Sequence, residues 1–400
     1  MKKTLLITAL LSTLFSCSND DELSNSTSEC SELDKIKIVT NNKSTTTCEA
    51  KYEFNSDSFS NLKYDWYINN KRIDNSTENT STLSYTFTEN GTYEICMKPI
   101  VTNGTCTLQK KCITLDIEDL KIGTVKDIQD YLVGLDGPMN PVLKGNELYF
   151  SESIRSFNRI SKIDITEATP TIKEVVLIPK SATLFEVPLI SALVFKDNIL
   201  YAAESRNGNN LGNIYKIDVT ADSPKAESIA KFLKPTDLAF KGNDLYVADL
   251  GNSTNSDQST IYKIDVTSSE IKKEVVIKPT LAPISIAFKG DELFMILRPN
   301  RFSGGQISKI NVTKNSPQLT DIATGLNLPR KITFIGNDLY LFDYSLKEIL
   351  RVDTGSGAMT SIISNGPDNF QNFIFTNGAV FLTSYTKRKI QKITLNCSEL

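Results

Sequence analysis

The fold of this chain is decided by a stretch that reads PTDLAFKGNDLYVAD, from Pro235 to Asp249. Two apolar runs are separated here by Lys241-Gly242-Asn243. Glycine and asparagine tolerate the positive φ of a tight turn, so the two runs are predicted to pair as an antiparallel hairpin. A third run, Thr260–Val266, alternates Ile with Lys and Asp, and a fourth, Glu274–Ile277, is apolar. The stretch therefore predicts one unit of four short strands.

The turn and the strand after it occur six times in the chain. The aliphatic residue of each copy returns at a spacing of roughly 40 to 50 residues, which is typical of propeller blades. These residues are Leu148, Leu200, Leu245, Leu293, Leu339 and Val380. The repetition predicts an all-β protein with a six-bladed β-propeller over residues 121–400. We interpret the turn lysine, Lys241 in the clearest copy, as a solvated surface residue.

The two ends of the repeat region complement each other. The last copy ends at its third strand, Ile390–Leu395, while an unassigned strand, Thr124–Leu132, precedes the first copy. We expect this N-terminal strand to complete the last blade, because the pairing removes the two free sheet edges of an open ring.

The repeat is specific enough to resemble known propellers. Pro235-x-x-Leu238-Ala239-Phe240, a turn, Leu245-Tyr246-Val247-Ala248-Asp249 and an Ile-x-Lys-Ile-Asp strand look like an NHL-type repeat. The chain is similar to the wider group of NHL, YncE and SMP-30/gluconolactonase-like propellers. The resemblance implies the fold, whereas function resides in the site that a fold carries.

The first 17 residues have the pattern of an export signal. Lys2-Lys3 precede an apolar run that ends in Leu14-Phe15-Ser16-Cys17. This ending resembles the bacterial lipobox and implies that Cys17 carries a lipid. Residues 18–29 are polar and acidic, which predicts a flexible tether and resembles the surface-export signal of Bacteroidota lipoproteins. We expect a lipid-anchored outer-membrane protein exposed at the cell surface, with a periplasm-facing position as the alternative.

Residues 30–118 show a different pattern of longer alternating strands. Tyr64-Asp65-Trp66-Tyr67-Ile68, a turn at Asn69-Asn70 and Gly91-Thr92-Tyr93-Glu94-Ile95-Cys96 predict an immunoglobulin-like β-sandwich. The same motifs resemble PKD-type domains, although the acidic Gly-Asp-Gly turn of that family is absent.

Six cysteines remain besides Cys17, and an even number in an exported chain indicates disulfides. We favour Cys96–Cys112, because two strands joined around Asn103-Gly104 bring these residues nearly opposite each other. The other candidates, whose pairing the sequence leaves open, are Cys30, Cys48, Cys106 and Cys397.

Composition excludes several functions. The 400 residues include no histidine, which excludes His-dependent nucleophiles, general bases and metal sites. A net charge of −3 without basic runs argues against a nucleic-acid partner, and attachment to a membrane is expected only through the N-terminal lipid.

A binding face is predicted where the loop that opens the first strand of each blade meets the loop between the second and third strands. Polar residues open the first strands, and cations with one aromatic residue gather in blades four and five. The ligand-binding candidates are Asn140, Asp237, Asn372, Arg298, Arg301, Phe302, Arg330 and Lys331. We interpret Arg298, Arg301 and Lys331 as exposed loop charges. The acid that ends each second strand is interpreted as a turn cap.

Three functions are compatible with these features. A non-enzymatic envelope lipoprotein that binds a glycan, peptide or protein on its propeller face is favoured, because no catalytic constellation is recognisable. A metal-assisted hydrolase or lactonase is the first alternative, with Asn140, Asp237 and Asn372 as oxygen ligands of a Ca²⁺-type ion. A structural subunit of an outer-membrane assembly is the second. No other cofactor is expected.

Overall fold

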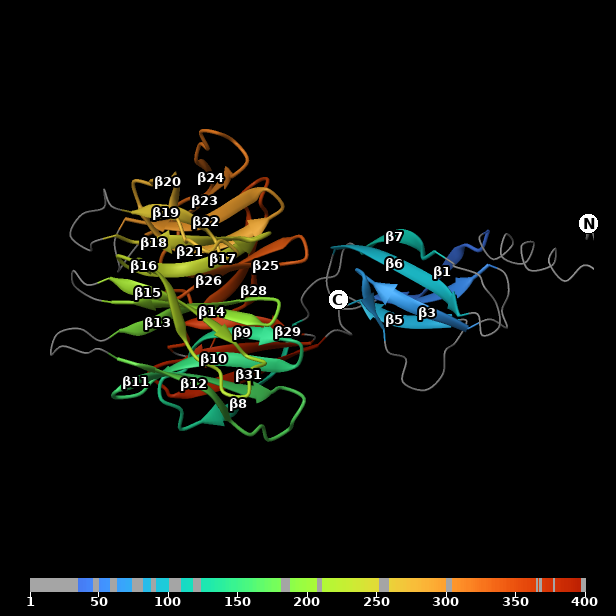
Figure 1. The fold of residues 1–400 in the computed structure, drawn as a ribbon, viewed down its shortest axis with the longest axis horizontal. Coiled ribbons are helices and arrows are strands. Elements are labelled where there is room, and N and C mark those ends of the chain that lie inside the picture. Colours follow the sequence, from blue (N-terminus) through green and yellow to red (C-terminus); the bar gives the residue numbers. More distant parts are fainter. Residues whose placement is uncertain are drawn as a thin grey trace, which may run out of the picture. The chain divides into compact units, whose positions relative to one another are not determined.

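The computed structural model describes the chain from Lys35 to Asn396 with gaps. The described residues are 35–45, 50–57, 63–73, 82–87, 91–100, 109–117, 124–180, 188–206, 211–251, 259–299, 304–364, 366, 369–376 and 378–396. Their regular elements are β-strands (Figure 1). The described part of the chain contains no helix that could span a lipid bilayer.

The chain divides into two compact units, the first built from segments up to Asp116 and the second mainly from the chain after Ile117. Two sheets, with strand orders β1-β2-β5 and β4-β3-β6-β7, account for the first seven strands. These strands are β1 (Ile38–Thr45), β2 (Ala50–Ser56), β3 (Lys63–Ile68), β4 (Lys71–Arg72), β5 (Thr82–Phe87), β6 (Gly91–Ile100) and β7 (Lys111–Ile117).

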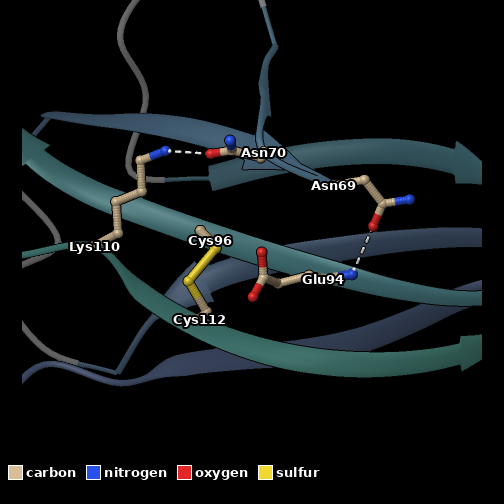
Figure 2. The surroundings of a disulfide bond; sticks show 6 residues. All are labelled: Asn69, Asn70, Glu94, Cys96, Lys110 and Cys112. Atoms are coloured by element: carbon tan, nitrogen blue, oxygen red, sulfur yellow. Dashed lines mark hydrogen bonds between the residues drawn. A yellow bond between two sulfur atoms is a disulfide. The ribbon is translucent and has the colours of Figure 1, made fainter. Parts of the chain in front are cut away.

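Aromatic side chains fill the space between these two sheets. Phe54 of β2 and Trp66 of β3 are buried, with ring centroids 6.4 Å apart. The predicted turn joins β3 to β4, and Asn69 and Asn70 both adopt positive φ. A disulfide bond joins Cys96 of β6 to Cys112 of β7, as predicted (Figure 2). The other five cysteines lie outside the described residues.

The second unit contains six four-stranded antiparallel sheets, numbered here 1 to 6 along the chain. Sheet 1 consists of β9 (Met139–Lys144), β10 (Glu147–Ser153), β11 (Phe157–Asp164) and β12 (Lys173–Pro179). Sheet 2 consists of β13 (Leu189–Lys196), β14 (Ile199–Ser205), β15 (Gly212–Asp218) and β16 (Glu227–Phe232). Sheet 3 consists of β17 (Pro235–Lys241), β18 (Asp244–Asp249), β19 (Thr260–Asp265) and β20 (Glu274–Ile277).

The last three sheets follow the same order. Sheet 4 consists of β21 (Ala282–Lys289), β22 (Glu292–Arg298), β23 (Gln306–Asn311) and β24 (Thr320–Ala323). Sheet 5 consists of β25 (Pro329–Ile335), β26 (Asp338–Asp343), β27 (Glu348–Val352) and β28 (Met359–Ile363). Sheet 6 consists of β29 (Asn372–Thr376), β30 (Ala379–Ser384), β31 (Lys389–Asn396) and β8 (Thr124–Val133).

The first strands of the six sheets form a closed ring. Each contacts the first strand of the next sheet, and β29 of sheet 6 contacts β9 of sheet 1. The ring is closed by β8, which pairs antiparallel with β31 from Val133 opposite Lys389 to Thr124 opposite Asn396 (Figure 1). The predicted completion of the last sheet by the N-terminal strand is therefore confirmed.

Neighbouring sheets are joined by residues of the repeat itself. The aromatic residue of a second strand packs edge-on against the Phe of the next first strand, as Tyr246 does against Phe288 at 4.8 Å. The turn lysine is only partly solvated, with 31% of the Lys241 side chain exposed, because its ammonium group also bonds to the next sheet. Lys241 donates from Nζ to the Gly290 carbonyl at 3.1 Å and lies over the Phe288 ring. The equivalent Lys144, Lys196 and Lys289 likewise donate to carbonyls of the next turn.

Candidate ligand-binding site

Residues near the starts of the first strands contact one another from sheet to sheet. Lys331 of sheet 5 reaches Asp237 of sheet 3, and its Nζ lies 2.9 and 2.8 Å from the two carboxylate oxygens. Ser285 of sheet 4, between them, donates from Oγ to Asp237 Oδ2 at 2.6 Å. Asp237 is almost fully buried, whereas a quarter of the Lys331 side chain is exposed. The pair therefore connects three sheets at their inner edge.

A second contact of this kind lies where sheets 6, 1 and 2 meet. Asn372 donates from Nδ2 to Asn140 Oδ1 at 3.3 Å, and Asn140 donates to the Ile190 carbonyl at 2.7 Å. Asn140 adopts a positive φ of 51°, a conformation that asparagine tolerates better than most residues. Both asparagines are half-buried and already hydrogen-bonded within the protein.

Asn140, Asp237 and Asn372 do not fit a calcium site. Calcium requires several oxygen ligands that converge on one point. Both oxygens of Asp237 instead contact the ammonium group of Lys331, while the two asparagines bond to each other. A divalent cation at Asp237 would have to displace Lys331, so the geometry opposes the metal-assisted alternative.

The acids that end the second strands are caps in sheets 3 and 5, as interpreted from the sequence. Asp249 accepts hydrogen bonds from the backbone N–H groups of Leu233, Lys234 and Gly251. Asp343 accepts from those of Leu328, Ser345 and Leu346. These carboxylates hold the loops in place and are buried.

In sheets 1 and 2 the equivalent acid binds an arginine. Glu152 accepts from Arg159 Nε and Nη2, both at 2.9 Å, in a two-bond pair. Glu204 accepts from Arg206 Nη2 at 3.1 Å and from Asn213 Nδ2 at 2.7 Å. Both carboxylates are buried, so each arginine offsets the cost of an acid removed from water.

Sheet 4 departs from this pattern. In sheets 2, 3 and 5 an acid near the end of the second strand pairs with a residue at or near the start of the first strand. In sheet 4 the residue at this position is Leu297, which pairs with Pro283. The next residue, Arg298, ends β22 and is only 3% exposed. Its Nε and Nη2 have no hydrogen-bond partner in the described part of the chain. Burial, and then the positive charge of Arg330, lowers the pKa of Arg298 to about 10, while Asp343 opposes the shift. Arg298 is therefore not the exposed loop charge that the sequence suggested.

Arg330 follows Pro329, which packs with the stem of Arg298 around Gly305, and Arg330 is half-buried. It occupies a β-bulge between Pro329 and Lys331, and bulges commonly redirect a side chain next to a functional site. Its guanidinium carbon lies 4.6 Å above the ring of Tyr344, and its buried Nε has no hydrogen-bond partner among the residues described here. Burial also lowers the pKa of Arg330. The two arginines are named the arginine pair below.

The structure places the predicted cations in two different surroundings. Arg298 packs beside Pro329, which precedes Arg330, whereas Lys331 forms an ion pair with Asp237. Arg301 and Phe302 lie outside the described residues. Sequence reasoning missed Tyr344, although an aromatic residue directly after the capping Asp343 is the signal that could have identified it.

Comparisons with known proteins find solved structures of similar fold at low sequence identity. The sequence matches no protein family and no curated protein. A solved structure of unknown function from Bacteroides thetaiotaomicron is similar over 90% of this chain and 98% of that chain, with 12% identity and a TM-score of 0.53. A chain of the nidogen/laminin complex is similar over 63% of this chain and 90% of that chain, with 14% identity and a TM-score of 0.48. An inactive virginiamycin B lyase from Staphylococcus aureus with quinupristin is similar over 90% of this chain and all of that chain, with 13% identity and a TM-score of 0.41.

Proposed function

We propose that this protein is a non-enzymatic envelope lipoprotein that binds a glycan, peptide or protein partner on the loop face of its propeller. The observation that carries the proposal is the arginine pair, because buried guanidinium donors of Arg298 and Arg330 lack acceptors among the residues that the structure describes. Buried polar groups are normally hydrogen-bonded, so such donors indicate a ligand. The absence of histidine from the chain and the lysine bound to Asp237 favour binding over catalysis.

In this proposal, the other parts of the chain anchor the propeller and hold its loop face toward the partner. Residues 1–17 would be the lipoprotein signal, residues 18–29 a tether, residues 30–118 a PKD/Ig-like sandwich that acts as a spacer, and residues 121–400 a six-bladed propeller of the NHL-like group. The anchor would hold the protein at the outer membrane with its face toward the cell surface. The two sheets around Trp66 and the six sheets that follow support this division.

Cross-linking from the loop face tests the binding function. Tyr385 and Leu346 are exposed in turns between second and third strands, whereas Asn243 is exposed in a turn at the opposite end of its sheet. A photoreactive residue at Tyr385 or Leu346 is expected to form a discrete adduct in intact cells, and the same residue at Asn243 is not. Adducts of equal yield at all three positions, or none at any position, would refute a binding face.

Replacement of Cys17 tests the anchor. The variant Cys17→Ala is expected to leave the membrane fraction and to lose incorporation of a labelled fatty acid, because one lipidated cysteine supplies the hydrophobic attachment. Cys30→Ala is the matched control and should remain in the membrane fraction. Retention of the Cys17 variant after a high-salt wash would show that the anchor lies elsewhere.

A further inference from the structure

Arg298 of the arginine pair has one guanidinium edge that is buried without a hydrogen-bond partner among the described residues. Nε and Nη2 of Arg298, the two unpartnered atoms, lie on the same side of the planar group. Two parallel N–H donors on one edge match the two oxygens of a carboxylate. Arg159 of sheet 1 uses these same two atoms to bind both oxygens of Glu152. Sheet 1 therefore contains the two-bond arginine–carboxylate contact that Arg298 does not make with any described residue.

The repeat explains why no internal acid satisfies Arg298. In sheets 1 and 2 the acid that ends the second strand binds the arginine of its own hairpin. In sheet 4 that position holds Leu297, and the acid of the neighbouring sheet, Asp343, is occupied by backbone N–H groups. The cost of burying Arg298 is thus not offset within the described part of the chain.

Arg330 also differs from the residues at the equivalent bulge positions of other sheets. The bulge residues of sheets 2 and 3, Ser191 and Thr236, donate to the Pro235 and Pro283 carbonyls of the next sheet at 2.7 and 2.8 Å. Arg330 takes this position in sheet 5 without such a bond from Nε, and its guanidinium lies over Tyr344 instead. Tyr344 is itself held by a hydrogen bond from its hydroxyl to Asn369 Oδ1 at 3.0 Å. The second guanidinium is therefore held in a fixed orientation.

The surrounding backbone also holds Arg298 in place. A Cβ at Gly305 would lie 3.2 Å from Arg298 Cγ and 2.5 Å from Pro329 Cγ, so the chain packs closely against the arginine stem. Such packing fixes the side chain before any ligand arrives, which reduces the entropy lost on binding.

We propose that Arg298 and Arg330 form a recognition site for one carboxylate group of the ligand, with Arg298 binding both carboxylate oxygens and Arg330 supplying the second positive charge. The inference deepens the proposed function, since it assigns an acidic group to the partner of the loop face. Sulfate and phosphate present a similar pair of oxygens and are tested beside carboxylate.

The site is tested by anion titration of the purified full-length chain. Thermal midpoints are measured in acetate, sulfate or phosphate against chloride at equal ionic strength. Saturable binding is expected to raise the midpoint, by about 5 °C at a hundredfold excess over Kd. Arg298→Met and Arg330→Met should abolish the rise. Arg155→Met, at an exposed arginine between β10 and β11 on the same face, should retain it.

A second readout separates a recognition site from a structural one. Arg298→Met should raise the midpoint in chloride by ~2 °C or more, because methionine removes a buried charge without a partner. A lower midpoint for Arg298→Met in chloride, an equal rise with anion in all variants, or no saturable rise in the parent protein would each overturn the assignment. Anion binding without adducts at Tyr385 or Leu346 would leave this site intact and refute only the proposed partner binding.

Discussion

Deletion of β8 (Thr124–Val133) is expected to prevent stable folding of the propeller at 37 °C. The deletion leaves β31 paired on one side only and removes Tyr131 and Leu132 from the core cluster of sheets 6 and 1. Tyr131 packs against Phe381 at 5.2 Å and donates from its hydroxyl to the Glu167 carbonyl at 2.8 Å. Loss of two such side chains costs about 5 kcal/mol or more, which approaches the whole stability of a typical domain. Thermal unfolding followed by near-ultraviolet circular dichroism measures the effect.

A deletion of similar length provides the control. Removal of residues 18–29 should leave the thermal midpoint unchanged, because we expect these residues to form a tether. The single substitution Tyr131→Ala is a milder test that preserves chain length, and it should cost about 3 kcal/mol. Equal midpoints for both deletions would show that ring closure contributes nothing to stability.

Asp237→Asn is expected to cost about 3 kcal/mol, because it leaves Lys331 beside a buried neutral amide and removes a charged acceptor from Ser285 and the Ile286 N–H. The expected fall in thermal midpoint is roughly 6 °C. Unfolding in urea would measure the free energy directly. The double variant Asp237→Asn with Lys331→Met should recover part of the loss, since the uncompensated ammonium is then absent.

An exposed ion pair supplies the comparison. Lys272 and Glu270 lie 3.5 Å apart with side chains 78% and 79% exposed, and their replacement by Ala should change stability by less than about 1 kcal/mol. A similarly small effect for Asp237→Asn would mean that the pair joining sheets 3, 4 and 5 is not structural. Asp237 and Lys331 would then be available to a ligand, as the sequence suggested.

Elements of the fold could be predicted closely because they depend on local patterns. The strands Asp244–Asp249 and Glu274–Ile277 have their predicted bounds, since short apolar runs and the turn residues beside them are local signals. Gly242 has the positive φ that the hairpin requires. The pairing of β8 with β31, far apart in the chain, was also predictable, because a missing strand at one end matched a surplus strand at the other.

The sequence predicted where the candidate site lies in the fold but not the burial and partners of its charged residues. The residues that open the first strands do meet, but the sequence assigned wrong surroundings to Arg298 and Lys331. Both were interpreted as exposed loop charges, whereas Arg298 is buried and Lys331 binds Asp237. The bonds of the turn lysines were missed for the same reason, since their acceptors belong to the next sheet.

The sequence alone determined the repeat, the antiparallel hairpins, the pairing of Cys96 with Cys112 and the absence of imidazole chemistry, because each follows from residue type and spacing. Only the tertiary structure decided which charges are neutralised. Asp237 and Lys331 are separated by 94 positions, and Arg298 is buried by the packing of sheets 4 and 5. Desolvation and ion pairing depend on distances through space, which no local pattern of residues encodes.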